Sequence, residues 1–256
     1  MHYFFLGSFL PPLCFGSPTA MSFASLIDLL EKNMSMRDFK KIHSIRSFVD
    51  LKNVKRLFQN IPLDTRGNMT EKELDEAIVT REGLPHYLYE HLDRHDQAIK
   101  KVGHFSRVFV DFFREMENKK RGFLSFYFSF ERKWRLLMLG FRSKKTRRDL
   151  TKELQYEDVH DPVVAYILAQ KDRPQFDFPL DNQDLHDQLK QVEGQPMEQY
   201  KTLARYRFNT WMERIEKCPF SVDYILGYFV QFMLIEDWQS LSRERGYQKL
   251  SEIVGE

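Results

Sequence analysis

FLSFYFSFERKWRLLMLGFRSKKTRRDL, residues 123–150, is the stretch that decides the fold, and its two halves differ in character. The first half, up to Leu139, is aromatic and aliphatic, which is typical of a helix buried in a protein core. The second half is basic: residues 131–152 contain nine Lys or Arg and two acids, a local charge of +7. Because the whole chain carries only +2, the other residues together carry −5. We therefore predict a buried helix that continues into a charged, exposed end.

The composition indicates a helical protein with an aromatic core. A chain of 256 residues allows one large domain or two smaller ones. The 23 Phe residues are spread along helical patterns, which predicts at least two layers of helices. The two cysteines, Cys14 and Cys218, are 204 positions apart and belong to no CxxC motif. The sequence therefore predicts neither a disulfide nor a thiolate metal site, and it favours a reducing compartment.

Helical patterns recur along the chain, and strand patterns are nearly absent. Capping signals mark the starts of helices at Ser35, Thr70 and Asp161. We predict an all-α, multi-helical bundle of roughly ten helices joined by short connections. We expect one domain, residues 1–256, with sub-lobes at about 1–82, 83–170 and 171–256. The clearest patterns span residues 23–32, 39–58, 98–118, 123–150, 197–217 and 222–244.

Neither the first residues nor the apolar runs predict a membrane span. Residues 1–16 lack Lys or Arg before their apolar part, and Pro11 and Pro12 interrupt it, so we expect a short helix or strand rather than a cleaved signal peptide. The apolar run 224–235 is shorter than the ~18–20 residues that a membrane helix needs. We predict that it is a core helix and that any membrane association is peripheral.

Motifs of common enzyme classes are absent from the sequence. It contains no GxxxxGK[ST] phosphate-binding loop, no GxGxxG dinucleotide motif and no GxSxG nucleophile motif. If the chain belongs to a nucleotide-driven system, we expect another component to hold the nucleotide. We therefore predict a protein that is not an enzyme and that has neither cofactor nor small-molecule substrate.

Three histidines form the strongest metal-like pattern. His91 and His95 are four residues apart on one predicted helix, and His86 precedes them by just over one turn. That spacing can bind zinc, but the segment lacks the HExxH order that would add a general base. We favour a solvated, histidine-rich helix and predict no metal site. A metal-dependent hydrolase centred on His91 and His95 is the alternative.

Two acids lie beside long apolar runs, where a charge needs a partner. Glu131 and Glu236 each adjoin a long apolar run. A partly buried carboxylate is costly unless it is paired. For Glu131 we predict an ion pair with Arg135, one turn later in the same helix, with Arg142 and Arg148 as alternative partners.

The basic run, residues 142–148, is the predicted site of interaction. Three interpretations are open: a solvated helix face, a surface that contacts an acidic protein, or a nucleic-acid site. The near-zero total charge and the lack of neighbouring exposed aromatic residues argue against nucleic acid. We favour a protein partner, and a helical nucleic-acid-binding protein is the alternative. The predicted contact residues are Arg142, Lys144, Lys145, Arg147 and Arg148.

Six segments resemble a family of uncharacterised bacterial proteins that are encoded beside the genes of V/A-type ATPases. They are residues 3–13, 48–57, 62–74, 130–145, 148–155 and 161–172. The chain is also similar to the C subunit of these rotary machines, the counterpart of the d subunit of V-ATPases. That second similarity is carried by acids on long apolar helices, Asp50, Glu131 and Glu236, which fit a threefold pseudo-repeat.

The resemblance implies a fold, a role and partners. The C subunit is an all-helical, pseudo-threefold, funnel-like protein between the membrane rotor ring and the central stalk, and it transmits torque without chemistry. By resemblance we expect a non-catalytic component of a V/A-type ATPase or ATP synthase, which transports protons or sodium ions. The implied partners are central-stalk proteins of the V-type ATPase and the membrane rotor ring. The implied location is cytoplasmic, peripheral to the inner membrane through the ATPase complex.

Overall fold

The computed structural model describes residues 2–119 and 121–241. All named elements in these residues are helices, and the β pairing within them is one isolated antiparallel bridge between His2 and Ser221. The predicted all-α, multi-helical class is therefore confirmed. The chain divides into two compact units, which are described separately: unit 1 is residues 1–28 and 121–256, and unit 2 is residues 29–120. These boundaries do not coincide with the predicted sub-lobes.

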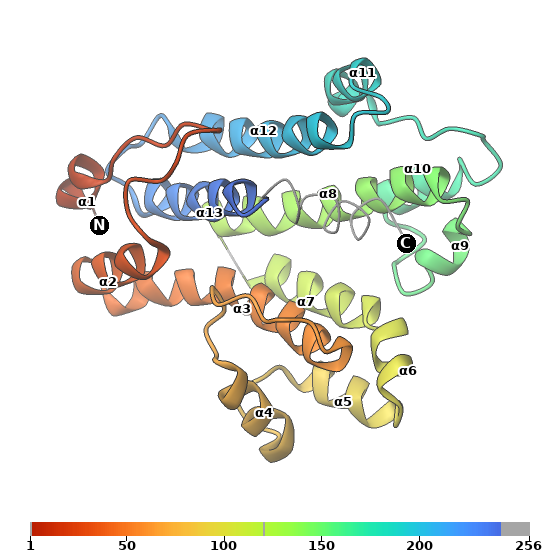
Figure 1. The fold of residues 1–256 in the computed structure, drawn as a ribbon, viewed down its shortest axis with the longest axis horizontal. Helices are drawn as coiled ribbons and strands as arrows, with labels where there is room; N and C mark the ends of the chain where they lie inside the picture. The colour runs from red at the N-terminus through yellow and green to blue at the C-terminus, as the bar shows by residue number, and fades with distance from the viewer. Residues whose placement is uncertain (1, 120, 242–256) are drawn as a thin grey trace. The chain divides into compact units, whose positions relative to one another are not determined.

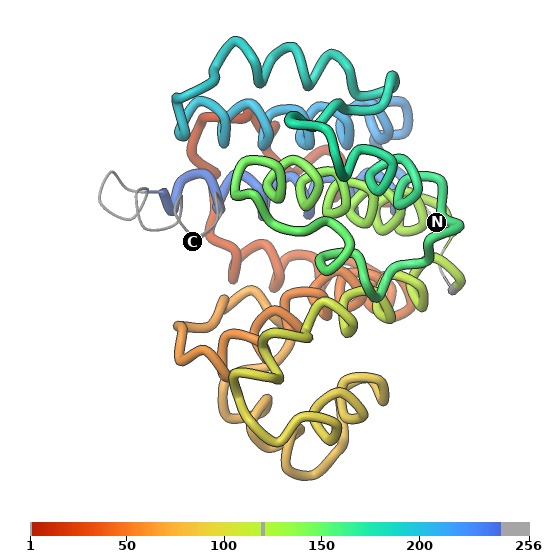
Figure 2. The backbone as a smooth tube through the Cα atoms, turned by 90° about the vertical axis from the view of Figure 1, so that its right-hand side faces the viewer, coloured from red at the N-terminus to blue at the C-terminus, as the bar shows by residue number. Residues whose placement is uncertain are grey.

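Unit 1 is built on three long helices that run side by side: α8 (Phe123–Lys145), α12 (Pro196–Ile215) and α13 (Val222–Gln239) (Figure 1). The chain enters this unit through α1 (Phe4–Phe9), which contacts α13. The helix α11 (Gln183–Gln191) packs against α12 (Figure 2). The remaining short elements are α9 (Leu150–Glu153), α10 (Pro162–Leu168) and the 3-10 helix η1 (Leu180–Asn182).

The helix α8 is buried in unit 1 over much of its length, as its apolar sequence pattern predicts. Its aromatic half faces α12, where the Tyr127 and Trp211 rings lie 5.8 Å apart. Its aliphatic half, with Leu136, Leu137 and Met138 all at most 3% exposed, forms one core with α9, α10, the loop before η1 and α11. Burying these side chains supplies the main driving force for this half of the unit.

Gly140 does not end α8, although glycine is a weak helix former. The helix continues through it to Lys145. Gly140 instead permits a close contact, because a Cβ at this position would lie 2.6 Å from Cε2 of Phe176. The small residue thus lets the loop before η1 pack directly on α8.

Unit 2 contains the second half of α2 (Phe23–Asn33), which begins in unit 1, and five further helices. These are α3 (Met36–Gln59), α4 (Glu71–Thr80), α5 (His86–Arg94), α6 (Ala98–Gly103) and α7 (Ser106–Lys119). An aromatic cluster joins α3 to α7, where the ring of Phe48 stacks on that of Phe112 at 5.3 Å and also contacts Phe109 and Phe113. Such clusters contribute both buried area and preferred ring geometry.

The predicted boundaries are wrong in two places. The pattern over 98–118 predicted one helix, but α6 ends at Gly103 and α7 begins at Ser106. Gly103 is a weak helix former, and Phe105, which is 0% exposed, turns into the core at the break. The last helix ends at Gln239, and most of its predicted extension to residue 244 lies outside the described residues. Within the part of the chain that the structure describes, no helix has the length and apolarity to cross a membrane.

Candidate functional site

The buried acid of α8 has a partner from another helix. Arg207, on α12, places Nη2 2.7 Å from Oε1 and 2.8 Å from Oε2 of Glu131. Burial alone acts to lower the pKa of Arg207, but the charge and hydrogen bonds of Glu131 raise it overall. Glu131 is therefore held by an arginine of another helix, rather than by the predicted partner Arg135 of its own helix. Arg135 is four residues away on the same helix, but its guanidinium extends to a different carboxylate.

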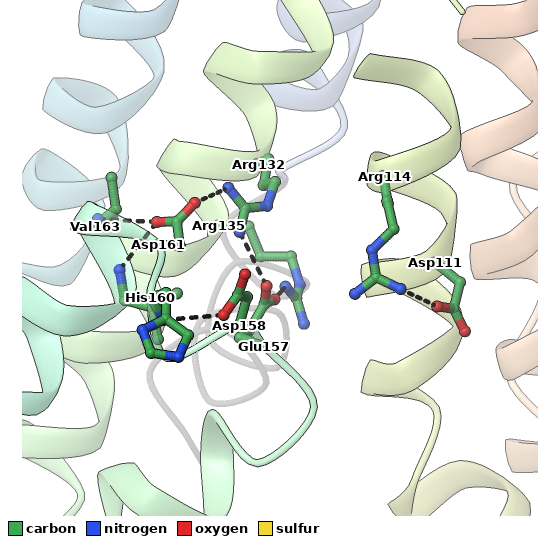
Figure 3. Close-up of polar contacts among 10 residues, drawn as sticks. Asp111, Arg114, Arg132, Arg135, Glu157, Asp158, His160, Asp161 and Val163 are labelled. Carbon is green, nitrogen blue, oxygen red and sulfur yellow. Dashed lines mark hydrogen bonds and ion pairs between the residues drawn. The ribbon is translucent and has the colours of Figure 1, made fainter. Parts of the chain in front are cut away.

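That carboxylate belongs to Glu157, in the connection between α9 and α10 (Figure 3). The side chain of Glu157 is only 3% exposed and receives Arg135 Nη1 at 2.7 Å and Arg132 Nη2 at 3.2 Å. Arg132 also donates through Nη1 to Asp161 Oδ2 at 2.7 Å. Two arginines and two acids thus fix the α9–α10 connection to α8, and they neutralise the first cations of the charged half of the helix.

Asp161 is also the N-cap residue of α10. Its Oδ1 accepts backbone N–H groups from Val163 at 2.8 Å and Val164 at 3.2 Å. Burial acts to raise the pKa of Asp161, but the Arg132 hydrogen bond and charge and these two backbone donors lower it overall. The folded-state pKa is therefore below the unfolded value. The stability contributed by ionised Asp161 is present above the unfolded pKa and is lost as the pH falls through the folded pKa.

Replacing Asp161 with Ala is therefore expected to lower the free energy of unfolding of unit 1 by about 1–2 kcal/mol at pH 7. The deficit should shrink as the pH falls below the ordinary aspartate pKa of about 4 and on through the lower pKa of the folded state, where the native carboxylate is protonated too. Urea unfolding followed by tryptophan fluorescence measures this difference in the free energy of unfolding. Asp161→Asn is the matched control, since it keeps a capping oxygen and removes only the charge. A deficit of Asp161→Ala that stays constant down to pH 3 would contradict the assigned role of the charge.

The basic run begins in the last turn of α8 and continues past its end. The backbone N–H of Arg148 donates to Ser143 O at 2.8 Å and that of Arg147 to Lys144 O at 3.4 Å, which is the Schellman pattern of a helix end. Arg147 occupies the left-handed position, with φ of 54°, where glycine is usual. A non-glycine residue there costs roughly 1–2 kcal/mol. The turn therefore presents consecutive arginines at the helix end, where cations also complement the helix dipole.

The cations of the basic run have few internal partners. Among the described residues, no side chain forms an ion pair with Arg142 or Arg147. Arg142 is half-buried, and burial lowers the pKa of its guanidinium. Arg148 lies 3.9 Å from Glu153, and both side chains are well exposed, so this pair contributes little. Within the described part of unit 1, the cations at positions 142–147 thus differ from Arg132, Lys133 and Arg135, because they form no ion pair with a carboxylate.

Two lysines of the basic run also line a pocket. Lys144 and Lys145 stand at the rim of a cavity of about 150 Å³ between the end of α8, the loop before η1, and α11. Lys144 Nζ donates to the backbone carbonyl of Lys171 at 2.6 Å, and Lys145 Nζ lies 3.4 Å from Gln199 Oε1. These contacts hold the ammonium groups in place without neutralising them, which makes this end of α8 a candidate anion-binding surface.

The three predicted histidines do not form a common site. His91 is buried, and its Nε2 lies 2.8 Å from Lys101 O, so this nitrogen carries a proton and donates it. The ring of His95 stacks on that of His104, with centroids 4.9 Å apart, and meets that of His91 edge-on at 5.0 Å. His86 pairs with Glu90 on the helix surface. Within residues 2–119 and 121–241, no group of three His, Cys, Asp or Glu side chains is arranged to hold a metal.

Comparison with known proteins gives the family of this chain. A family model described as "Protein of unknown function (DUF2764)" matches residues 1–256. The chain belongs to the DUF2764 family. An uncharacterized protein of Chlamydia trachomatis serovar D is 27% identical over 258 residues, covering 97% of each chain. An uncharacterized protein of Chlamydia muridarum is 26% identical over 255 residues, covering 97% of this chain and 96% of the relative. No solved structure matches the chain.

Sequence reasoning missed three parts of this DUF2764 chain's polar architecture. It did not identify Arg207 or Glu157, which hold the charges of α8, or the pocket beside the basic run. Arg207 follows Glu131 by 76 positions, so no spacing rule connects them. Glu157 had a usable signal, because it is an acid between two helices that follows an arginine-rich helix. The pocket depends on residues from three segments, and it becomes visible only when these are placed in space.

Proposed function

We propose that this chain is a non-catalytic component of a V/A-type rotary ATPase that couples the central stalk to the membrane rotor ring. The observation that supports binding is the basic run: among the described residues, Arg148 is the one cation of this run with an ion-pair partner, Glu153, at 3.9 Å. The link to a rotary ATPase rests on the sequence resemblance alone, since the family description and the relatives' names give no activity or partner. The proposal includes a pseudo-threefold, funnel-like arrangement and a cytoplasmic place at the inner membrane through the complex.

Arg142 favours a protein partner over a merely solvated helix face. A solvated face keeps its charged heads in water, where they need no partner. The guanidinium of Arg142 is instead half-buried without a carboxylate in the described structure. Such a group gains most from an acidic side chain supplied from outside the unit. The surrounding lysines and arginines would then steer and orient an acidic surface of a stalk protein, more than supply raw affinity.

The test reverses two charges of the basic run. In the double variant Lys144→Glu with Arg148→Glu, we expect co-purification with central-stalk proteins to fall at least tenfold, because attraction becomes repulsion. The tagged chain is expressed together with the ATPase of its host, and stalk proteins in the eluate are quantified by mass spectrometry. The matched control is Arg121→Glu with Lys217→Glu, which makes the same charge change at exposed residues of unit 1 outside the basic run.

Two outcomes would count against the proposal. Unchanged co-purification of the double variant would exclude the basic run as the contact surface, and a wild-type chain that never recovers stalk proteins would remove the ATPase role. The nucleic-acid alternative is separated by titration with single- and double-stranded DNA and RNA. The nucleic-acid alternative requires binding that weakens steeply as the salt concentration rises. A titration without detectable binding would exclude this alternative.

A further inference from the structure

The pocket beside the basic run has a charged rim and an apolar interior. Lys144, Lys145 and Lys190 contribute three ammonium groups, and Glu193 contributes the single carboxylate among its lining residues. The lining therefore carries two net positive charges. Lys145 Nζ also lies 4.6 Å above the ring of Phe141, so the charge is held against an aromatic wall. An anion that enters the pocket meets cations already placed at its mouth.

The apolar interior comes from three segments. Phe141 belongs to α8, Phe176 to the loop before η1 and Leu189 to α11. Phe176 and Leu189 are 4% and 3% exposed, so both are firmly fixed in the core of unit 1. A cavity of about 150 Å³ with such walls holds a short chain of carbon atoms, and burying that chain is favourable.

His186 adds one directional hydrogen-bond donor. It lines the same pocket and is 8% exposed. Its Nδ1 lies 3.3 Å from Gln183 Nε2, an amide group that can only donate, so Nδ1 accepts and the ring proton is on Nε2. Among the described residues, no acceptor faces this Nε2–H. Because His186 lines the pocket, a ligand oxygen inside the pocket can accept a hydrogen bond from this N–H.

We propose that this pocket binds a carboxylate group carried on a short apolar chain. The imidazole N–H donates to the carboxylate, and the lysines pair with its charge. The aromatic and aliphatic side chains pack against the apolar chain. A phosphate dianion fits less well, because Glu193 repels the second charge and the apolar walls stay uncovered. In the assembled complex, the source is an acidic side chain of the protein that docks on the basic run, and in this respect the inference rests on the proposed function.

The test uses the full chain and hexanoate as the probe. We expect hexanoate to shift the NMR resonance of the His186 imidazole in a saturable way at millimolar concentration, and calorimetry gives the same dissociation constant. The resonance is assigned by its absence in His186→Gln. Lys190→Gln and Lys145→Gln should each weaken binding at least fivefold. Lys217→Gln is the matched control, an exposed lysine outside the pocket, and it should bind as the wild type does.

Hexanol and inorganic phosphate separate the two halves of the proposal. Both should bind at least fivefold more weakly than hexanoate, since hexanol lacks the charge and phosphate lacks the chain. Equal binding of hexanol would show that the pocket binds apolar chains without regard to charge, and equal binding of phosphate would show that it binds anions in general. Either result overturns the proposal. So does a His186 resonance that hexanoate does not shift. Because the free chain is used, hexanoate binding would survive a failure to recover stalk proteins.

Discussion

Replacing Arg207 with Met is expected to lower the free energy of unfolding of unit 1 by about 3 kcal/mol, near the lower end of the range for breaking a buried ion pair. Arg207 supplies the hydrogen bonds to both carboxylate oxygens of Glu131, at 2.7 and 2.8 Å. The side chain of Glu131 is only 8% exposed, so it cannot exchange its lost partner for water. The variant also loses the contact of the guanidinium with the ring of Trp211, 4.9 Å away.

A double-mutant cycle separates the charge from the packing. Glu131→Gln alone leaves Arg207 without its hydrogen-bonded carboxylate, whereas the double variant removes both charges of the pair and should recover most of the lost stability. All three tryptophans, Trp134, Trp211 and Trp238, belong to unit 1, so urea unfolding followed by their fluorescence reports on this unit. Arg214→Met is the matched control on α12, where an exposed arginine lies over the ring of Phe126. A double variant no more stable than Arg207→Met would contradict the account.

The local features of this chain could be predicted because they depend on neighbouring residues. Ser35 and Thr70 each accept the backbone N–H three residues later, as their capping patterns predict. Asp161 caps α10 with proline at the first helical position, also as predicted. Apolar spacing found α3, α8 and α12 for the same reason: a helix brings residues three and four apart onto one face, and the core selects that face.

The partners of the charged groups could not be predicted, because they depend on tertiary structure. An in-helix partner for Glu131 was the natural choice from spacing, yet such a pair on one helix is weak. Arg207 offers two hydrogen bonds from a facing helix, and Arg135 finds a better-buried acid in Glu157. The sequence correctly marked where a charge needs a partner. The packing of α8, α12 and the α9–α10 connection decides which residue becomes the ion-pair partner.

Replacing Gly67 with Ala is expected to destabilise unit 2 by about 3 kcal/mol. Gly67 lies in the loop between α3 and α4, against the buried side of α3. An added Cβ would stand 2.5 Å from Oδ1 of Asp50 and 3.1 Å from Nδ2 of Asn53. Neither group can easily move aside. Asp50 accepts Asn68 Nδ2 at 2.8 Å and Met69 N at 3.1 Å, and Asn53 exchanges two hydrogen bonds of 2.8 Å with the backbone of Asp64.

The loss should be local to the loop and to the helices that it joins, because these hydrogen bonds fix the loop to α3. Amide hydrogen exchange followed by mass spectrometry should therefore show faster exchange in peptides from α3 and α4, and unit 1 provides the internal reference. Gly103→Ala is the matched control: nothing lies within 4 Å of its added Cβ, so the same substitution on α6 should stabilise unit 2 by about 0.5–1 kcal/mol. If both variants shift exchange in the same direction, the effect comes from glycine's backbone freedom and not from the contact with Asp50.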